Sequence, residues 1–262
     1  MEYALITGAS SGIGLELAYI MAEKGHHLIL VARREAVLQD LKNHLEKSFQ
    51  VTVEIVAMDL SIPGQTQTLY QHCVNNQLTV NCLINNAGFG DYGKFDVSKL
   101  EIYQNMLQLN IAALTELTAL FVRDMTQRKS GRILNVGSLA AFQPCPNFAV
   151  YAATKAYTMQ FTEALNYELR GTGLSVTLLS PGITETGFFS RSNLADAAIV
   201  KNGMMNARTV AMAGYQAMMV GKLNVIPGWK NNILAFGSKT MPSREGLLRI
   251  SAALFRDTAA TH

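Results

Sequence analysis

The sequence predicts an α/β protein with a doubly wound parallel sheet of about seven strands and helices on both faces. Three observations lead to this fold class. Short apolar segments alternate along the chain with longer helix-like segments. Most of the short segments are almost continuously apolar, as expected of parallel strands covered on both faces. A glycine-rich turn, TGASSGIG, joins the first strand-like segment to the first helix-like segment.

The predicted elements follow one another without a break in composition, so we expect a single domain over residues 1–262. The strand-like segments are 3–7, 27–33, 51–59, 80–86, 131–138, 174–182 and 222–228. The helix-like segments between them are 12–25, 35–49, 64–77, 98–129 and 149–172.

Two C-terminal segments fall outside this alternation. Residues 184–221 are the least regular and are rich in Met, Ala and Asn, and we expect them to form a substrate-loop insertion above the site. Their apolar side chains suit a lid over an apolar ligand, or equally helices that pack on the sheet. These side chains are Phe188, Phe189, Met204, Met205, Met212, Tyr215, Met218 and Met219. Residues 229–256 have helical spacing and predict a C-terminal extension that contacts a membrane surface, a partner chain or neither.

The composition excludes several classes of protein. Apolar residues make up 49% and charged residues 16%, which suits a globular core and excludes a disordered chain. The formal charge of +3 comes from scattered residues, so we expect no nucleic-acid partner. Three cysteines and five histidines show no metal-ligand spacing. With no secretory signal and no apolar run near the ~18 residues of a membrane span, we expect a cytoplasmic protein without a transmembrane segment.

The glycine turn predicts a phosphate-binding site. Gly8 permits a tight turn, Gly12 permits close approach of the backbone to a phosphate, and Gly14 lets the helix pack on the strand. The helix N-terminus, with Ile13 in its first turn, offers unpaired N–H groups to a pyrophosphate. Hydroxyls of Ser10 and Ser11 add donors. A plain βα turn would also use glycine, but the strand before and the helix after favour nucleotide binding.

The end of the second strand favours NADP(H) over NAD(H). A site for NAD would place an acidic residue here to bind the ribose 2′-hydroxyl, whereas this chain has Arg33 and Arg34. Arginine forms charge-assisted bonds with a 2′-phosphate. The alternative is a pair of solvated arginines that Glu35 partly neutralises.

These motifs occur together in the order of a known family. The glycine turn, NNAG at 85–88, Asn110, Ser138, and Tyr151 with Lys155 resemble the short-chain dehydrogenase/reductase family, in its single-domain branch. The resemblance covers residues 3 to about 228. It implies a Rossmann-type domain for dinucleotide binding and catalysis, and an NADP(H)-dependent oxidoreductase that acts on a small-molecule carbonyl or secondary alcohol.

The four candidate catalytic residues are Asn110, Ser138, Tyr151 and Lys155. Residues i and i+4 share a helix face, so the Lys155 ammonium is expected to lower the pKa of the Tyr151 phenol. Tyr151 then serves as general acid in reduction or general base in oxidation. The resemblance implies that Lys155 also holds the nicotinamide ribose, that Ser138 orients the substrate oxygen, and that Asn110 holds a water linking Lys155 to solvent.

The resemblance assigns the remaining cofactor contacts to three strand ends. Asp59 and Leu60 would meet the adenine, although an Asp here also suits a helix cap. Small residues at the end of the fourth strand, Asn86, Ala87 and Gly88, would lie along a ribose. The loop after the sixth strand would meet the carboxamide or a phosphate through Pro181, Gly182, Ile183, Thr184 and Thr186.

Two other functions compete with this one. A non-catalytic NADP(H)-binding sensor or scaffold would use the same fold, but such proteins usually lack the tyrosine or the lysine. A sugar-nucleotide epimerase would usually carry another glycine spacing and a longer C-terminal domain. The substrate itself is open, and the Met-rich segment favours an apolar ketone or aldehyde. The helices near 103–129 and 149–172 look apolar on more than one face, which predicts a homodimer or homotetramer.

Overall fold

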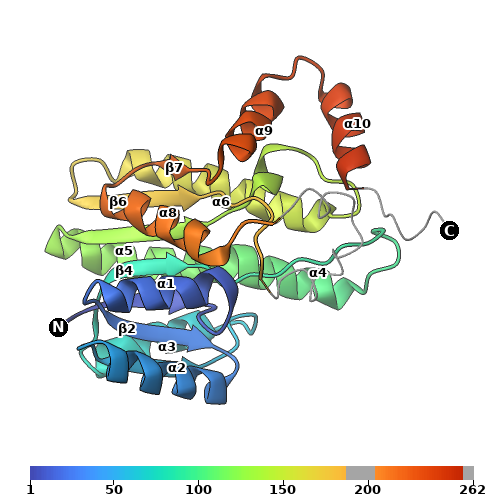
Figure 1. Cartoon of the computed structure of the whole chain (residues 1–262). Coiled ribbons are helices and arrows are strands. Elements are labelled where there is room, and N and C mark those ends of the chain that lie inside the picture. The colour runs from blue at the N-terminus through green and yellow to red at the C-terminus, as the bar shows by residue number, and fades with distance from the viewer. Residues whose placement is uncertain (187–203, 256–262) are drawn as a thin grey trace.

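A computed structural model of the protein describes residues 1–186 and 204–255. Its seven strands form one parallel sheet in the order β3-β2-β1-β4-β5-β6-β7. The strands are Glu2–Thr7 (β1), His27–Ala32 (β2), Val53–Ala57 (β3), Thr79–Asn85 (β4), Gly131–Val136 (β5), Leu174–Leu179 (β6) and Asn224–Val225 (β7). The predicted doubly wound fold is confirmed (Figure 1).

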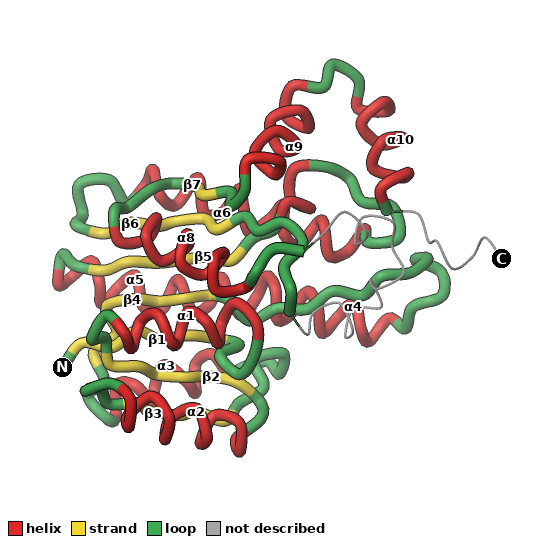
Figure 2. Tube along the Cα trace, in the orientation of Figure 1, coloured by secondary structure: helices red, strands yellow, loops and turns green. Residues whose placement is uncertain are grey.

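Helices cover both faces of this sheet (Figures 1 and 2). One core layer packs Gly12–Glu23 (α1), Glu35–Ser48 (α2) and Ala207–Met219 (α8) against the strands. The other packs Gln65–Asn75 (α3), Leu114–Arg128 (α5) and Ala149–Glu168 (α6). Strand order reverses between β1 and β4, so the loops that leave their carboxyl ends diverge and open a crevice there.

Buried polar side chains fix the centre of the sheet against the second layer of helices. Asn85 at the end of β4 donates to Asn135 of β5 at 2.9 Å and to Thr118 of α5 at 3.0 Å. Asn135 in turn donates to Thr162 of α6 at 2.9 Å. Because buried amides without partners are costly, this network sets one register between strands and helices just below the crevice.

Several element bounds differ from the sequence-based expectation. The β3 strand covers Val53–Ala57 within the predicted 51–59, and β7 has only two of the seven predicted residues. Pro227 has no N–H to extend the β7 ladder. The predicted helix 98–129 consists of Leu100–Leu107 (α4), a π-helix Gln108–Ala113 (η1) and α5. A short 3-10 helix, Leu139–Phe142 (η2), follows β5.

The segment 184–221 was expected to lie above the site, and its described part corrects this. Helix α8 packs on α1, β5 and β6, and Val210, Ala211 and Met218 are buried in the core. The periodicity of this Ala- and Met-rich stretch is that of a helix covering the sheet. Phe188 and Phe189 lie outside the described residues. Among the described residues of this segment, Thr184 and Thr186 line the cavity.

The C-terminal extension forms two helices, Trp229–Thr240 (α9) and Arg244–Leu254 (α10), as the sequence predicts for 229–256. Figure 1 shows them as a hairpin that projects from the body beyond β7 and α6. Here α9 contacts η2. Below we call α9, α10 and the turn between them the C-terminal hairpin.

One helix in the described part of the chain, Leu100–Arg128, is long and apolar enough to cross a membrane by length and composition. Its α5 part packs on α3, β4 and β5, and Leu117 and Phe121 are buried in the core. Its place in the second layer of the fold accounts for the apolar residues of the α5 part.

Candidate active site

A cavity of about 450 Å³ opens at the carboxyl edge of the sheet, where β1 and β4 diverge. All the predicted site residues line it except Gly14 and Asn110. Residues from the glycine turn, the ends of β2 to β6 and the C-terminal hairpin thus share one space. This is where open α/β sheets bind their ligands.

The glycine turn fits the close approach of a phosphate-bearing ligand. Gly8 and Gly12 have φ of +68° and +58°, which side chains rarely adopt. A Cβ on Gly12 would stand 2.9 Å from Thr186 Cγ2, and one on Gly14 would stand 2.4 Å from the Gly8 carbonyl oxygen. Each position therefore requires glycine, which leaves backbone N–H groups facing the cavity at the start of α1.

Thr7 joins the glycine turn to the NNAG segment, and the sequence analysis missed it. Its Oγ1 accepts hydrogen bonds from the amides of Asn86 and Ala87, both at 3.0 Å. The Asn86 side chain donates back to the Thr7 carbonyl at 2.9 Å. The signal for this role was a lone hydroxyl at the last position of a buried strand. The pairing holds two cavity walls in a fixed relation.

Two arginines, Arg33 and Arg34, follow β2 and lie beside the glycine turn. Arg34 Nη2 donates to the Ser10 carbonyl at 2.9 Å and to the Ser10 hydroxyl at 3.1 Å. Arg33 forms an exposed ion pair with Asp59, at 3.6 Å between Nη1 and Oδ2. Both side chains line the cavity next to the turn. The arrangement concentrates positive charge beside the N-terminus of α1.

Asp59 does not cap the following helix, the alternative that the sequence left open, because α3 begins at Gln65 with Gly64 as its N-cap. Asp59 Oδ1 accepts from the Ser61 amide at 3.0 Å and the Ser61 hydroxyl at 2.7 Å. Burial acts to raise the pKa of Asp59, but these two hydrogen bonds and Arg33 outweigh it and hold the pKa below its usual value. These contacts close a local turn at Ser61 and leave Asp59 at the cavity, which Asp59 and Leu60 both line.

Tyr151, Lys155 and Ser138 meet in the middle of the cavity. Helix α6 carries Tyr151 and Lys155 on one face, with Lys155 Nζ 5.7 Å from the centre of the Tyr151 ring. Lys155 Nζ donates to the Val136 carbonyl at 2.8 Å, at the end of β5. The Ser138 side chain hydrogen-bonds Tyr151 and also accepts from the Ala140 amide at 3.1 Å. Three polar groups from two elements therefore converge on one point.

Burial controls the protonation of this cluster in the protein alone. It raises the pKa of Tyr151 above its usual 10.0, and the hydrogen bond with Ser138 acts in the opposite direction. It lowers the pKa of Lys155 to about 8. The expectation that Lys155 lowers the tyrosine pKa is therefore not met here, because both charged forms lose solvation. At neutral pH Tyr151 is a phenol.

Asn110 lies behind the cavity, and both its amide nitrogen and its oxygen form hydrogen bonds within the protein. Its Nδ2 donates to the Phe89 carbonyl at 2.9 Å and to Thr154 Oγ1 at 3.0 Å. Its Oδ1 accepts from the Phe89 amide at 3.2 Å. Asn110 sits in the π-helix η1, and such segments recur at functional sites. The side chain therefore positions the loop at Phe89.

The loop after β6 closes the cavity from the side of Gly12. Thr184 Oγ1 donates to the Gly182 carbonyl at 3.0 Å, and Thr184 forms a parallel bridge with Met205. A Cβ on Gly182 would stand 2.5 Å from Asn231 Nδ2 of α9, so the loop packs closely on the C-terminal hairpin. Pro181, Gly182, Ile183, Thr184 and Thr186 all line the cavity.

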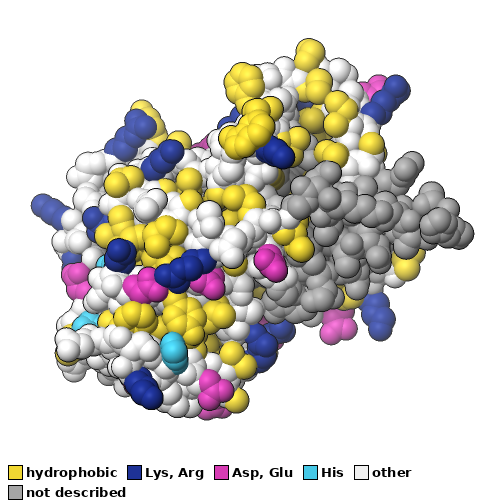
Figure 3. All heavy atoms as spheres, viewed as in Figure 1, with side chains coloured by type: hydrophobic (Ala, Val, Ile, Leu, Met, Phe, Trp, Pro, Cys, Tyr) yellow, Lys and Arg dark blue, Asp and Glu magenta, His cyan; other side chains and the backbone are white. Residues whose placement is uncertain are grey.

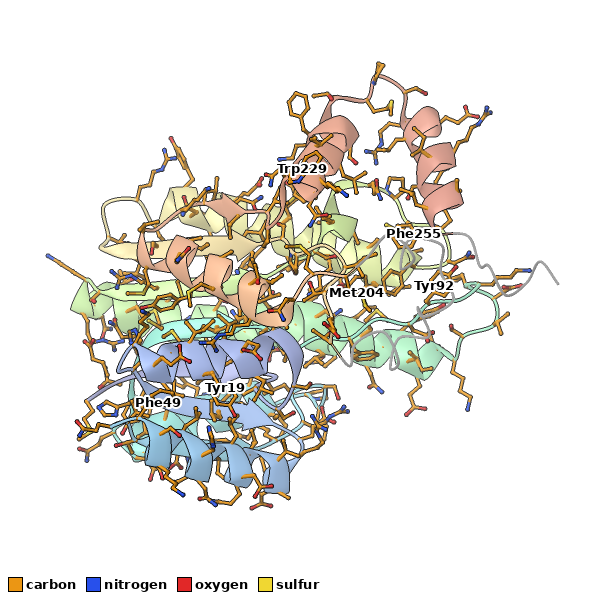
Figure 4. All side chains as sticks on the ribbon, viewed as in Figure 1. Tyr19, Phe49, Tyr92, Met204, Trp229 and Phe255 are labelled. Carbon is orange, nitrogen blue, oxygen red and sulfur yellow. The ribbon has the colours of Figure 1, made fainter. Side chains whose placement is uncertain are left out.

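The far end of the cavity is aromatic, and the sequence analysis did not identify its residues. The Phe148 ring stacks on Tyr151 with centroids 4.3 Å apart and lies 6.2 Å from Phe255. Tyr92 donates from its hydroxyl to the Phe255 carbonyl at 2.5 Å, and Figure 4 shows the two residues side by side. Phe89 and Leu234 complete this apolar wall, which we call the aromatic end. No sequence spacing links residues so far apart.

Gln143 is the polar exception near the aromatic end. It is buried, lines the cavity, and accepts a hydrogen bond from the Ser238 hydroxyl of α9 at 3.1 Å through its Oε1. Its amide nitrogen is a donor of the kind that fixes a ligand's orientation in an apolar pocket.

Known proteins resemble this chain along most of its length. The model of the short chain dehydrogenase family matches residues 2–197. The 7beta-hydroxysteroid dehydrogenase of Clostridium sardiniense is 30% identical, over 78% of this chain and 77% of that protein. The 17-beta-hydroxysteroid dehydrogenase type 3 of Mus musculus is also 30% identical, over 69% of this chain but only 59% of its own length.

A solved structure agrees with the fold. The short-chain dehydrogenase from Sphingobium yanoikuyae in complex with NADPH superposes with a TM-score of 0.82 at 30% identity, covering 95% of this chain and 96% of that one. Both the family match and this neighbour place the sheet, the glycine turn and the crevice in a nucleotide-binding oxidoreductase fold. The chain belongs to the short-chain dehydrogenase/reductase family of oxidoreductases.

Proposed function

We propose that the protein is an NADP(H)-dependent reductase of apolar ketones or aldehydes, with Tyr151 as general acid. The observation that carries the proposal is the meeting of Tyr151, Lys155 and Ser138 in one cavity with a turn whose glycines, Gly8, Gly12 and Gly14, leave no room for a side chain. A nicotinamide cofactor bound there supplies hydride transfer. The protein supplies alignment, a proton and exclusion of water.

The residues at the glycine turn fit the diphosphate and the 2′-phosphate of NADP(H). Backbone amides of Gly12 and Ile13 would hold the diphosphate at the N-terminus of α1. Arg34 would bind the 2′-phosphate, since its present partners on Ser10 are neutral acceptors that an anion can outcompete. Arg33, already paired with Asp59, would add a weaker contribution.

The protonation of the cluster favours the reductive direction. A reduction needs a proton on the donor when the substrate oxygen gains charge, and Tyr151 keeps its proton at neutral pH because burial raises its pKa. Ser138, bonded to the same phenol, would hold the substrate oxygen beside it. Lys155 would then favour the tyrosinate that forms, at the short separation that its place on α6 provides.

The aromatic end supports an apolar substrate. Phe148, Leu234 and Phe255 offer an apolar wall within reach of Tyr151, and two of the similar proteins named above are hydroxysteroid dehydrogenases. Gln143 would give such a substrate one polar contact away from the reacting carbonyl. The substrate class we propose is therefore a bulky apolar carbonyl compound with a second polar group.

The test measures NADPH oxidation by its absorbance with a panel of bulky and small ketones and aldehydes. We expect turnover of bulky apolar carbonyls. Tyr151→Phe should lower kcat by about 10²–10⁴-fold, the range for loss of a general acid. It should leave NADPH affinity within about twofold, and the exposed Tyr167→Phe is the matched control.

The alternative is a sensor or scaffold that binds NADP(H) without turnover, and the complete set of Tyr151, Lys155, Ser138 and Asn110 argues against it. Tight NADPH binding by the wild-type protein with no turnover of any carbonyl in the panel would support the sensor and contradict the reductase.

A further inference from the structure

Helix α9 has its apolar face on the outside. Trp229, Ile233 and Phe236 stand at positions i, i+4 and i+7, and are 70%, 63% and 69% exposed. The opposite face of α9 carries Ala235 and Ser238, which are buried against the body of the protein. We call the three exposed residues the α9 stripe. Figure 3 shows apolar side chains gathered on the C-terminal hairpin, and Figure 4 places Trp229 at the start of α9.

Basic side chains border the α9 stripe. By helical geometry Lys230 and Lys239 lie on opposite sides of it, and both are exposed. Residues 229–254 carry four basic and one acidic side chain, a formal charge of +3. This equals the formal charge of the whole chain, so the rest of the molecule is balanced. Positive charge and exposed apolar surface therefore coincide on one element.

We propose that the α9 stripe docks on an anionic phospholipid bilayer, with α9 lying in the plane of the interface. Helices that bind there combine a bulky apolar face with lysines beside it, and tryptophan prefers the level of the headgroups. Lys230 is placed beside Trp229 to reach phosphates, and Lys239, whose Nζ now lies 5.0 Å from the centre of the Phe142 ring, would turn to them while the three apolar side chains enter the acyl boundary. A zwitterionic surface would satisfy only the apolar half of this arrangement.

Docking would bring the aromatic end of the cavity close to the bilayer. Leu234 of α9 and Phe255 after α10 line that end, and Ser238 of α9 holds Gln143. An apolar substrate dissolved in the bilayer would then have a short path to the cavity. Docking itself does not depend on the proposed reaction, so the test measures binding alone and can fail while the reductase proposal holds.

The chain carries its own probe, because Trp229 is its single tryptophan. The experiment mixes the full chain with vesicles of phosphatidylcholine and phosphatidylglycerol at a 7:3 ratio and records tryptophan emission and co-sedimentation. We expect a blue shift as Trp229 leaves water, and binding that weakens in high salt. Vesicles of phosphatidylcholine alone should bind much more weakly.

Two double variants separate the apolar and the electrostatic contributions. Ile233→Ser with Phe236→Ser keeps the probe and should abolish co-sedimentation at lipid concentrations that saturate the wild type. Lys230→Glu with Lys239→Glu should weaken binding by about 25-fold or more, since each basic residue near an anionic surface contributes about fivefold. The matched controls, Ile62→Ser with Val220→Ser and Lys24→Glu with Lys47→Glu, change exposed residues elsewhere and should bind as the wild type does.

Other occupants of the α9 stripe would give different results. A blue shift that grows with protein concentration without vesicles, together with a doubled mass in light scattering, would assign the stripe to a second copy of the chain and overturn the proposal. The proposal would also be overturned if the wild type did not bind anionic vesicles, or if both the apolar and the lysine double variants bound them as the wild type does.

Discussion

The two ends of the cavity are built in different ways. At the polar end, the glycine turn, Arg33, Arg34 and Asp59 come from the first 60 residues and sit on consecutive strand ends. At the aromatic end, Phe89, Phe148, Leu234 and Phe255 come from four separate parts of the chain. The first end is held by backbone geometry and the second by side-chain packing. The polar end therefore suits a cofactor that many related enzymes share, and the aromatic end suits a substrate that differs between them.

Among single changes at the polar end, we expect a substitution of Gly12 to reduce NADPH affinity most. In Gly12→Ala the new Cβ would stand 2.9 Å from Thr186 Cγ2 at a φ of +58°, so the turn must shift where the diphosphate would approach. We expect NADPH affinity to fall by about 10–100-fold, measured by calorimetry, because a displaced turn loses charge-assisted hydrogen bonds.

Gly25→Ala is the matched control for Gly12→Ala. Gly25 has a similarly strained φ of +80° but nothing within 4 Å of the added Cβ. It should cost stability by about 1 kcal/mol or more through backbone strain alone, without a change in NADPH affinity. Equal losses of affinity in both variants would show that the glycine turn acts through folding only.

The choice between NADP(H) and NAD(H) should depend mainly on Arg34. Arg34→Gln removes a charged donor whose present acceptors are neutral, and we expect the preference for NADPH over NADH to fall by about tenfold. Arg33→Gln should have a smaller effect, because Arg33 already pairs with Asp59. Competitive titration with both cofactors measures the ratio. If Arg33→Gln combined with Arg34→Gln left the ratio of NADPH to NADH affinity unchanged, the assignment of the 2′-phosphate to these arginines would be wrong.

The residues of the polar end could be predicted from the sequence, whereas those of the aromatic end could not, and the reason is physical. Parallel strands end at one edge of the sheet, so Gly8, Asp59, Ser138 and Gly182 could be placed together from strand order alone. The short β7 and the π-helix η1 depend on tertiary packing, which propensity does not encode. Phe255 reaches the cavity through the angle of the C-terminal hairpin, which no local pattern determines.

Protonation of the cluster could not be predicted from spacing either. The i, i+4 spacing of Tyr151 and Lys155 predicts their proximity, but not the burial that dominates both pKa values. The same limit applies to Thr7, whose role depends on the amides of Asn86 and Ala87 reaching it from the loop after β4.

A change at the aromatic end should affect the substrate and spare the cofactor. Phe255→Ala removes apolar surface from the wall next to Phe148, and losing about 1 kcal/mol of contact corresponds to about a fivefold rise in KM for a bulky ketone. NADPH affinity and kcat with a small aldehyde should stay within twofold. A loss of NADPH affinity would mean that the two ends are coupled rather than separate.

The smallest expected effect concerns Lys155, which lies between the polar end and the aromatic end of the cavity. Its pKa is about 8 in the folded protein against 10.5 as the ordinary value, so the unfolded state binds more protons between about pH 8 and 10.5. The free energy of unfolding should therefore rise with pH in this window, relative to Lys155→Met, by about 1 kcal/mol from pH 8 to 9. Urea denaturation at pH 7, 8 and 9 measures the difference between the two proteins.

Buried thiols of Cys73, Cys82 and Cys145, whose pKa values are raised above 9.0, destabilise both proteins equally at higher pH, so their effect cancels in the difference. A difference independent of pH would mean that Lys155 stays fully charged in the folded state, and that its bond to Val136 compensates for burial.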